Sequence, residues 1–163
     1  MEGNSAIAGW VPGRLSSGRA SIFMFKKLFA PGNDSFPTSL ALLTLRFWLG
    51  ATMLMNHGAG KLKNYDTMAS SFPDPLGFGH IGSYVLVVSA EFFASILLMA
   101  GLVTRFAALI LAINMTVAFF VVHKAALTGE HSGELVFIYL AGYAALLLGG
   151  AGRISLDKVF FET

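Results

Sequence analysis

The chain of 163 residues contains no cysteine and few charged side chains. Without cysteine, a disulfide relay within the chain is excluded, and so are cysteine-ligated zinc and iron–sulfur sites. Charged residues make up 12% and hydrophobic residues 55% of the chain, whereas about a quarter of the residues of a soluble domain are charged. The net charge of +2 is too small to indicate a nucleic-acid partner. This composition indicates a chain that lies in the lipid bilayer.

Four apolar stretches fill most of the chain between residues 39 and 151, over residues 39–58, 81–103, 105–123 and 134–151. A helix needs about 20 residues to cross the ~30 Å hydrocarbon core. The second stretch passes into the third almost directly, at Thr104-Arg105, which predicts an antiparallel helix hairpin. The sequence therefore predicts an all-α polytopic membrane protein, an antiparallel bundle of four transmembrane helices.

We expect one membrane domain over residues 38–158, between a flexible N-terminal tail (residues 1–37) and a C-terminal tail (residues 159–163). Within the first tail, Ile22–Phe29 is a candidate amphipathic segment for the membrane interface. Lysine and arginine are shared unevenly, with seven on one side of the membrane and three on the other. The positive-inside rule then predicts that both termini lie in the cytoplasm.

Two charged residues fall inside the predicted spans. Arg46 lies about 12 Å into the first span, and Glu91 lies about 15 Å in when it is counted back from Gly101. Either charge alone in hydrocarbon is costly, so the matching depths predict an Arg46–Glu91 ion pair. Such a pair either fixes the helix register or forms the charged floor of a ligand cavity, and both interpretations stay open.

A polar seam rises from this predicted pair toward the opposite membrane surface. His57 follows Arg46 by eleven residues and shares its helical face, and His123 ends the third span at a similar level. Asn114 has the right depth but lies nine residues before His123, which places it on the opposite face of a straight helix. We therefore expect Asn114 to form a helix–helix hydrogen bond outside the site. The candidate ligand-binding residues are Arg46, His57, Lys61, Tyr84, Glu91, His123 and Glu134.

The histidines permit several interpretations. They are polar residues that cap helix ends at the interface, donors to the headgroup of a quinone, or ligands of haem or a metal ion. His57, His123 and His131 are only weak metal candidates, because no ligand spacing is diagnostic. Since the chain carries no redox centre of its own, any redox role requires a bound quinone, haem, metal ion or partner subunit.

Several short motifs follow one another in order over about residues 38–158. They are Arg46, His57-Gly58 with Lys61, Asp74-Pro75-Leu76-Gly77, Ala90-Glu91-Phe92, Gly101-Leu102-Val103-Thr104-Arg105, Val122-His123 and Gly152-Arg153-Ile154-Ser155-Leu156-Asp157. Together they resemble the DoxX family of small bacterial membrane proteins. The resemblance implies a four-helix bundle in the bacterial inner membrane, with Arg46, His57, Lys61, Glu91 and His123 as its polar positions. Because some redox relatives use cysteines, the lack of cysteine argues against a thiol-based role here.

The resemblance implies an association with membrane redox complexes, so the leading hypothesis is a subunit of a quinone-linked oxidoreductase. In that scheme, a quinone-like molecule lies between the helices near the outer surface. His57 and His123 bond the headgroup carbonyls, and the chemistry is shared with a partner subunit. Two alternatives stay open, a small-solute transporter and a scaffold whose buried polar residues specify packing. The bilayer is the expected environment in each case, and a homo-oligomer is compatible with all three.

Overall fold

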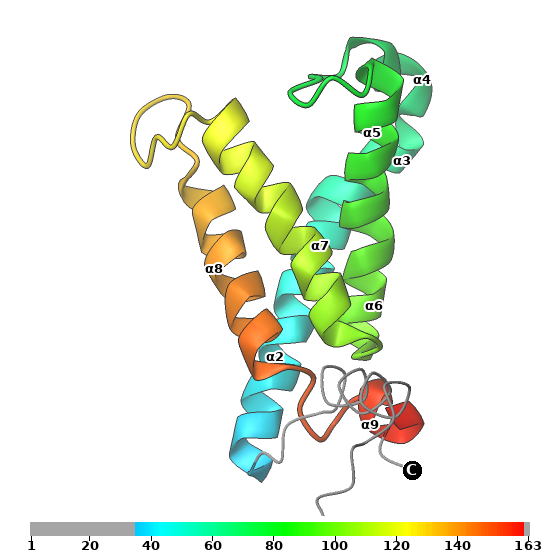
Figure 1. Ribbon diagram of the computed structural model, residues 1–163, viewed down its shortest axis with the longest axis vertical. Helices are drawn as coiled ribbons and strands as arrows, with labels where there is room; N and C mark the ends of the chain where they lie inside the picture. The colour runs from blue at the N-terminus through cyan, green and yellow to red at the C-terminus, as the bar shows by residue number, and fades with distance from the viewer. Residues whose placement is uncertain (1–34, 162–163) are drawn as a thin grey trace, which may run out of the picture.

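The computed structural model describes residues 35–161, and every regular element among them is a helix (Figure 1). Three continuous helices are long and apolar enough to cross a membrane: Phe36–Lys63, His80–Ala100 and Thr104–Val122. The last long helix, α8 (Glu134–Gly149), has 16 residues and is about 24 Å long, short of the ~30 Å core. The predicted all-α membrane fold is confirmed, and three of its four expected spans reach crossing length. Residues 1–34 of the predicted N-terminal tail, with its candidate interfacial segment, lie outside the described residues, whereas Phe36 and Pro37 belong to the first crossing helix.

The three crossing helices are not uniform α-helices, because each contains a π-helical segment of five residues. A π-helical turn holds one extra residue, so it shifts the face of every later residue by about 100°. The elements in chain order are α2 (Phe36–Met53), the π segment η1 (Leu54–Gly58), α3 (Ala59–Lys63), α4 (Tyr65–Met68), the 3₁₀ turn η2 (Ala69–Ser71), α5 (His80–Ser89), the π segment η3 (Ala90–Ala94), α6 (Ser95–Ala100), α7 (Thr104–Val117), the π segment η4 (Ala118–Val122), α8 and α9 (Leu156–Phe161).

The helix ends follow from local sequence. The Oγ atom of Ser35 accepts a bond from the backbone N–H of Thr38 at 3.5 Å, and Pro37 occupies the first turn of α2. In the hairpin that follows, α6 stops at Gly101, which takes a left-handed φ of 69°. The backbone N–H of Leu102 then bonds the carbonyl of Leu97 at 3.0 Å, a Schellman motif that reverses the chain into α7.

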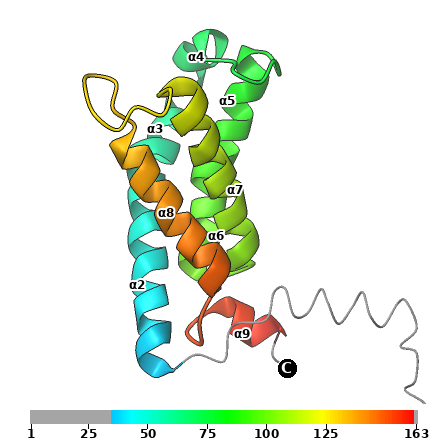
Figure 2. The ribbon, with the colours of Figure 1, turned by 60° about the vertical axis from the view of Figure 1, so that its left-hand side comes forward.

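The long helices form one bundle in which α7 packs along α8 and α2 packs along α6 (Figures 1 and 2). Its core contains the fully buried side chains of Met53, Leu98, Leu111, Tyr143 and Leu146. The start of α2 and helix α9 lie at the same end of the bundle. Helix α9 continues past residue 158, beyond the predicted start of the C-terminal tail. At the end remote from α9, the ribbons of α5 and α7 diverge (Figure 1).

Candidate functional site

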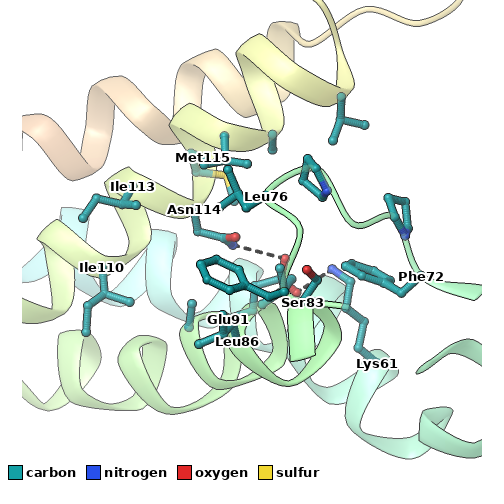
Figure 3. A pocket seen from close by; sticks show the side chains of 18 residues that line it. Lys61, Phe72, Leu76, Ser83, Leu86, Glu91, Ile110, Ile113, Asn114 and Met115 are labelled. Atoms are coloured by element: carbon teal, nitrogen blue, oxygen red, sulfur yellow. Dashed lines mark hydrogen bonds and ion pairs between the residues drawn. The ribbon is translucent and has the colours of Figure 1, made fainter. Parts of the chain in front are cut away.

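A charged pair and an amide meet where the three crossing helices approach one another. The Nζ atom of Lys61, at the end of the first crossing helix, lies 2.6 Å from Oε2 of Glu91 in η3. The side chains of these two residues are 20% and 5% exposed, so the pair is largely shielded from solvent. On the other side of the carboxylate, Nδ2 of Asn114 in α7 donates to Oε1 at 3.5 Å. Figure 3 shows the amide and the carboxylate pointing toward one another.

The close approach of two π segments brings the pair together. Gly58 in η1 lies against the backbone of η3, where a Cβ atom at Gly58 would come within 2.8 Å of the Glu91 carbonyl oxygen. Only glycine permits this contact. Tyr84 fixes the end of the same helix, because its buried hydroxyl donates to the Lys61 carbonyl at 2.5 Å. The Lys61 ammonium is therefore held beside Glu91 by backbone packing as well as by charge.

A cavity of about 530 Å³ lies beside this polar group. Lys61, Glu91, Asn114 and Ser83 are its polar lining, and the remaining walls are apolar. They come from α5, η3, α7, η4 and the loop of residues 72–79 (Figure 3). A mostly apolar pocket of this size with a few convergent polar groups is the usual form of a small-molecule site. The apolar lining residues are Phe72, Pro73, Pro75, Leu76, Phe78, Leu86, Val87, Ala90, Ile110, Ile113, Met115, Val117, Ala118 and Val122.

Arg46 belongs to a second polar cluster, at the opposite end of the bundle. Its guanidinium is fully buried and donates from Nη2 to the Ile154 carbonyl at 2.6 Å. It also lies against Gly101, where a Cβ atom would overlap Nη1. The buried carboxylate of Asp157 attracts it electrostatically and accepts bonds from the backbone N–H groups of Val103 at 2.5 Å and Thr104 at 2.9 Å. Asp157 therefore caps the N-terminus of α7 from a segment far away in sequence.

The predicted ion pair between Arg46 and Glu91 is wrong. Helix α2 begins below the turn between α6 and α7 (Figures 1 and 2), so Arg46 lies level with Gly101. Glu91 precedes Gly101 by ten residues, which places it about 15 Å further along the bundle. Counting depth from the start of each helix misses this offset, and Lys61 is the residue that reaches Glu91.

The other predicted site residues are spread around the polar group. His57 is half-buried, and its ring lies 6.2 Å from that of Tyr139. His123 ends η4, and its Nδ1 lies 3.0 Å from the His131 carbonyl oxygen. Glu134 is exposed in the first turn of α8. Neither histidine lines the cavity, and Tyr84 contacts two of its lining residues, Lys61 through its hydroxyl and Phe72 through its ring. Among residues 35–161, no three His, Asp or Glu side chains gather as a metal site would require.

Asn114 is the site residue that sequence reasoning misplaces. The predicted helix–helix hydrogen bond is present, but the exclusion of Asn114 from the site is wrong, because it lines the cavity. The prediction assumes a straight helix, whereas η4 lies between Asn114 and His123 and reduces their separation from about 180° to about 80°. One signal was available. Glu91 and Asn114 each lie ten residues from the hairpin turn, at Gly101 and Thr104, so the two side chains must stand at the same level.

Comparison with known proteins places the chain in a family. The family model described as DoxX matches residues 41–124, which include Arg46, Lys61, Glu91 and Asn114. The chain is also similar to a protein of Haemophilus influenzae, described as an uncharacterized protein. The two are 33% identical over 119 residues, which cover 69% of this chain and 85% of the relative. No solved structure matches the chain significantly. By the family match and by its apolar crossing helices, this membrane protein belongs to the DoxX family.

Proposed function

We propose that the protein binds a quinone-like molecule in the cavity and works as a membrane subunit of a redox system in the bacterial inner membrane. The observation that carries the proposal is the cavity itself, whose apolar walls converge on Lys61, Glu91 and Asn114. A quinone combines apolar and polar parts in the same way, because its ring and tail are apolar and its carbonyl oxygens accept hydrogen bonds. The volume of about 530 Å³ suits such a head together with the first part of its tail.

Each polar residue has a task in this proposal. The Lys61 ammonium and the Asn114 amide are donors, and both converge on the Glu91 carboxylate. Lys61 or Asn114 would donate to a carbonyl of the headgroup, while the other donor keeps its bond to Glu91. A bound quinone would supply electron transfer, with a partner subunit as its electron source. Glu91 would keep both donors in place beside the headgroup. His57 lies behind this pair as a charged or polar neighbour rather than as a direct donor.

Orientation and topology complete the proposal. The start of α2 and helix α9 lie at one end of the bundle, and the excess of lysine and arginine assigns that end to the cytoplasm. The cavity then lies in the outer half of the membrane. At the cytoplasmic end, the cluster around Arg46 and Asp157 packs the C-terminal segment under the bundle. This closed end favours a binding protein over a permeation path.

The proposal is tested by filling the cavity. Ala118 lines it on η4, so Ala118→Phe should remove co-purifying quinone and weaken binding of decylubiquinone at least about tenfold, a change of ~1.4 kcal/mol. Quinone is measured by mass spectrometry of lipid extracts, and affinity by titration in nanodiscs. Val121→Phe is the matched control, because Val121 is 47% exposed on the same helix and does not line the cavity.

Both variants should keep the wild-type unfolding midpoint, which separates lost binding from lost structure. Equal binding by Ala118→Phe and wild type, or a folded wild type that binds no decylubiquinone, contradicts the proposed function.

A further inference from the structure

We propose that the cavity exchanges its ligand directly with the lipid, through an opening between α5 and α7, while the apolar loop of residues 72–79 covers the side of the cavity that faces water. This inference rests on the proposed function and deepens it, because it restricts the ligand to molecules that partition into the membrane. It also fixes the orientation of the ligand, with its polar head at Lys61, Glu91 and Asn114 and its tail toward the lipid.

The opening lies between two helices of membrane-crossing length. Helix α7 packs against η3, and from there α5 and α7 diverge toward the end remote from α9 (Figure 1). The side chains of Leu86 on α5 and Ile113 on α7 line the cavity, yet they are 56% and 55% exposed. A residue that lines a cavity and is also more than half exposed stands at its rim. Both helices face hydrocarbon at this level, so this rim opens to lipid.

The loop of residues 72–79 covers the other side of the cavity. Phe72, Pro73, Pro75, Leu76 and Phe78 all contribute to its lining. Leu76 and Phe78 are themselves 56% and 61% exposed, so the loop forms a second rim, which it lines with apolar side chains on the aqueous side of the cavity. Because two of its residues are prolines, few backbone conformations are open to it.

The carboxylate of Asp74 holds this loop to α5. It accepts bonds from the backbone N–H groups of Phe78 at 2.9 Å and Gly79 at 2.8 Å, and from the Ser83 hydroxyl at 2.6 Å. These donors, Ser83 first, hold the pKa of Asp74 below its usual range, so the carboxylate stays charged and bonded at neutral pH. A further bond joins the His80 ring to the Phe72 carbonyl at 2.6 Å. The loop is thus fixed at both ends, whereas Leu86 and Ile113 at the other rim have apolar side chains that cannot tie α5 to α7 by a hydrogen bond.

The size of the cavity limits how much of the ligand it can hold. A volume of about 530 Å³ matches a drug-sized molecule rather than a whole lipid with a long chain. The part of the ligand that does not fit must leave the cavity, and an apolar tail leaves most favourably into hydrocarbon. The rim between Leu86 and Ile113 provides that exit, whereas the loop would direct the tail into water.

A photoreactive ligand tests the path. A ubiquinone that carries a diazirine on its tail is bound to the full-length protein in nanodiscs and irradiated, and the labelled residues are found by mass spectrometry. Labels should fall on Leu86, Ile110 and Ile113 and disappear with excess decylubiquinone. Competed labels on Leu76 and Phe78 instead would overturn lateral exchange and leave the proposed function intact. The absence of any competed label, together with no decylubiquinone binding, would overturn the proposed function itself.

A substitution at the rim gives an independent test. Ile113→Trp should slow the association of the tailed quinone by about tenfold, because the larger side chain narrows the opening. Leu109→Trp is the matched control, since Leu109 is exposed on the same helix and does not line the cavity. Wild-type association in Ile113→Trp would overturn the proposed path, provided that Ala118→Phe still blocks binding.

Discussion

The two buried charge clusters of this protein have the same kind of residues but different surroundings. Around Arg46 and Asp157, the partners are backbone groups of remote segments, which bond Nη2 of Arg46 and both oxygens of Asp157, and the guanidinium lies against Gly101. Around Lys61 and Glu91, the partners are side chains, and one side of the pair borders a cavity of about 530 Å³. The first cluster closes the structure, whereas the second leaves donors that a ligand can reach.

Burial of a charge does not by itself identify a binding site in this protein. Asp157 makes no contact that a ligand can replace without uncapping α7, because both of its oxygens accept backbone N–H groups. Glu91 is almost as buried, yet Lys61 and Asn114 reach it through side chains that can turn. We therefore expect changes in the first cluster to affect stability and changes in the second to affect binding.

The largest expected effect is the loss of stability in Gly101→Ala. The added methyl group would overlap the buried guanidinium of Arg46, and the φ of 69° disfavours any side chain. Displacing a buried charge costs about 3–5 kcal/mol and the left-handed backbone about 1–2 kcal/mol. Gly77→Ala is the control, because Gly77 has a φ of 77° with nothing within 4 Å and should lose only the smaller amount. The free energy of unfolding in detergent, followed by circular dichroism, gives both values. Equal losses of unfolding free energy in the two variants would contradict the stabilising role of the buried Arg46 side chain.

A smaller effect on stability and a clear effect on binding are expected for Gly58→Ala. Its methyl group would lie 2.8 Å from the Glu91 carbonyl oxygen, so η1 must move away from η3 and carry Lys61 with it. We expect decylubiquinone binding to weaken about tenfold, or ~1.4 kcal/mol. Gly60→Ala, two residues later with nothing within 4 Å, should bind as wild type and gain up to about 1 kcal/mol from helix propensity. Wild-type affinity in Gly58→Ala would show that ligand binding does not depend on the placement of Lys61 beside Glu91.

The smallest expected effect concerns Asp74 and pH. The pKa of Asp74 is lower in the folded protein than the ordinary ~3.9, so its contribution to the closed loop is complete above that value. The contribution is lost only as the pH falls through the folded pKa. The titration of Asp74 should therefore not change the rate of ligand dissociation between pH 8 and about pH 5. Over the same pH range, Asp74→Asn should release the ligand faster than wild type. The measurement uses a His80→Gln background, which removes the other titratable side chain that holds the loop. Identical dissociation rates with and without the Asp74→Asn substitution at pH 7 would contradict the role of this carboxylate.

Helix positions could be predicted from the sequence because they depend on local patterns. The hydropathy of the chain predicts long apolar helices over residues 39–58, 81–103 and 105–123, and the observed crossing helices are Phe36–Lys63, His80–Ala100 and Thr104–Val122. Glycine at position 101 and the short connection to Thr104 predict the hairpin that the structure contains. The first helix is predicted too short at both ends, because polar residues such as Lys61 and Lys63 continue it beyond the apolar stretch.

The composition of the candidate site could be predicted only in part. Lys61 and Glu91 both line the cavity, and charges within or beside a membrane span are rare and seek partners. Arg46 and Asn114 are misplaced for two separate reasons. Arg46 is misplaced because the offset of α2 along the bundle, relative to the α6–α7 hairpin, depends on packing at Gly58 and Gly101. Asn114 is misplaced because a π segment rotates the residues that follow it, so that Asn114 and His123 point in more similar directions than they would on a straight helix.

The sequence by itself determined that this chain forms apolar membrane helices, which of them make a tight hairpin, and that its charges must find partners. These properties follow from side-chain hydrophobicity and from turn chemistry, both of which act over a few residues. Only the tertiary structure decided that Glu91 pairs with Lys61, that Arg46 and Asp157 close the opposite end, and that a cavity lies between α5 and α7. Those choices depend on how far the helices slide and turn against one another, and contacts between residues remote in sequence set both.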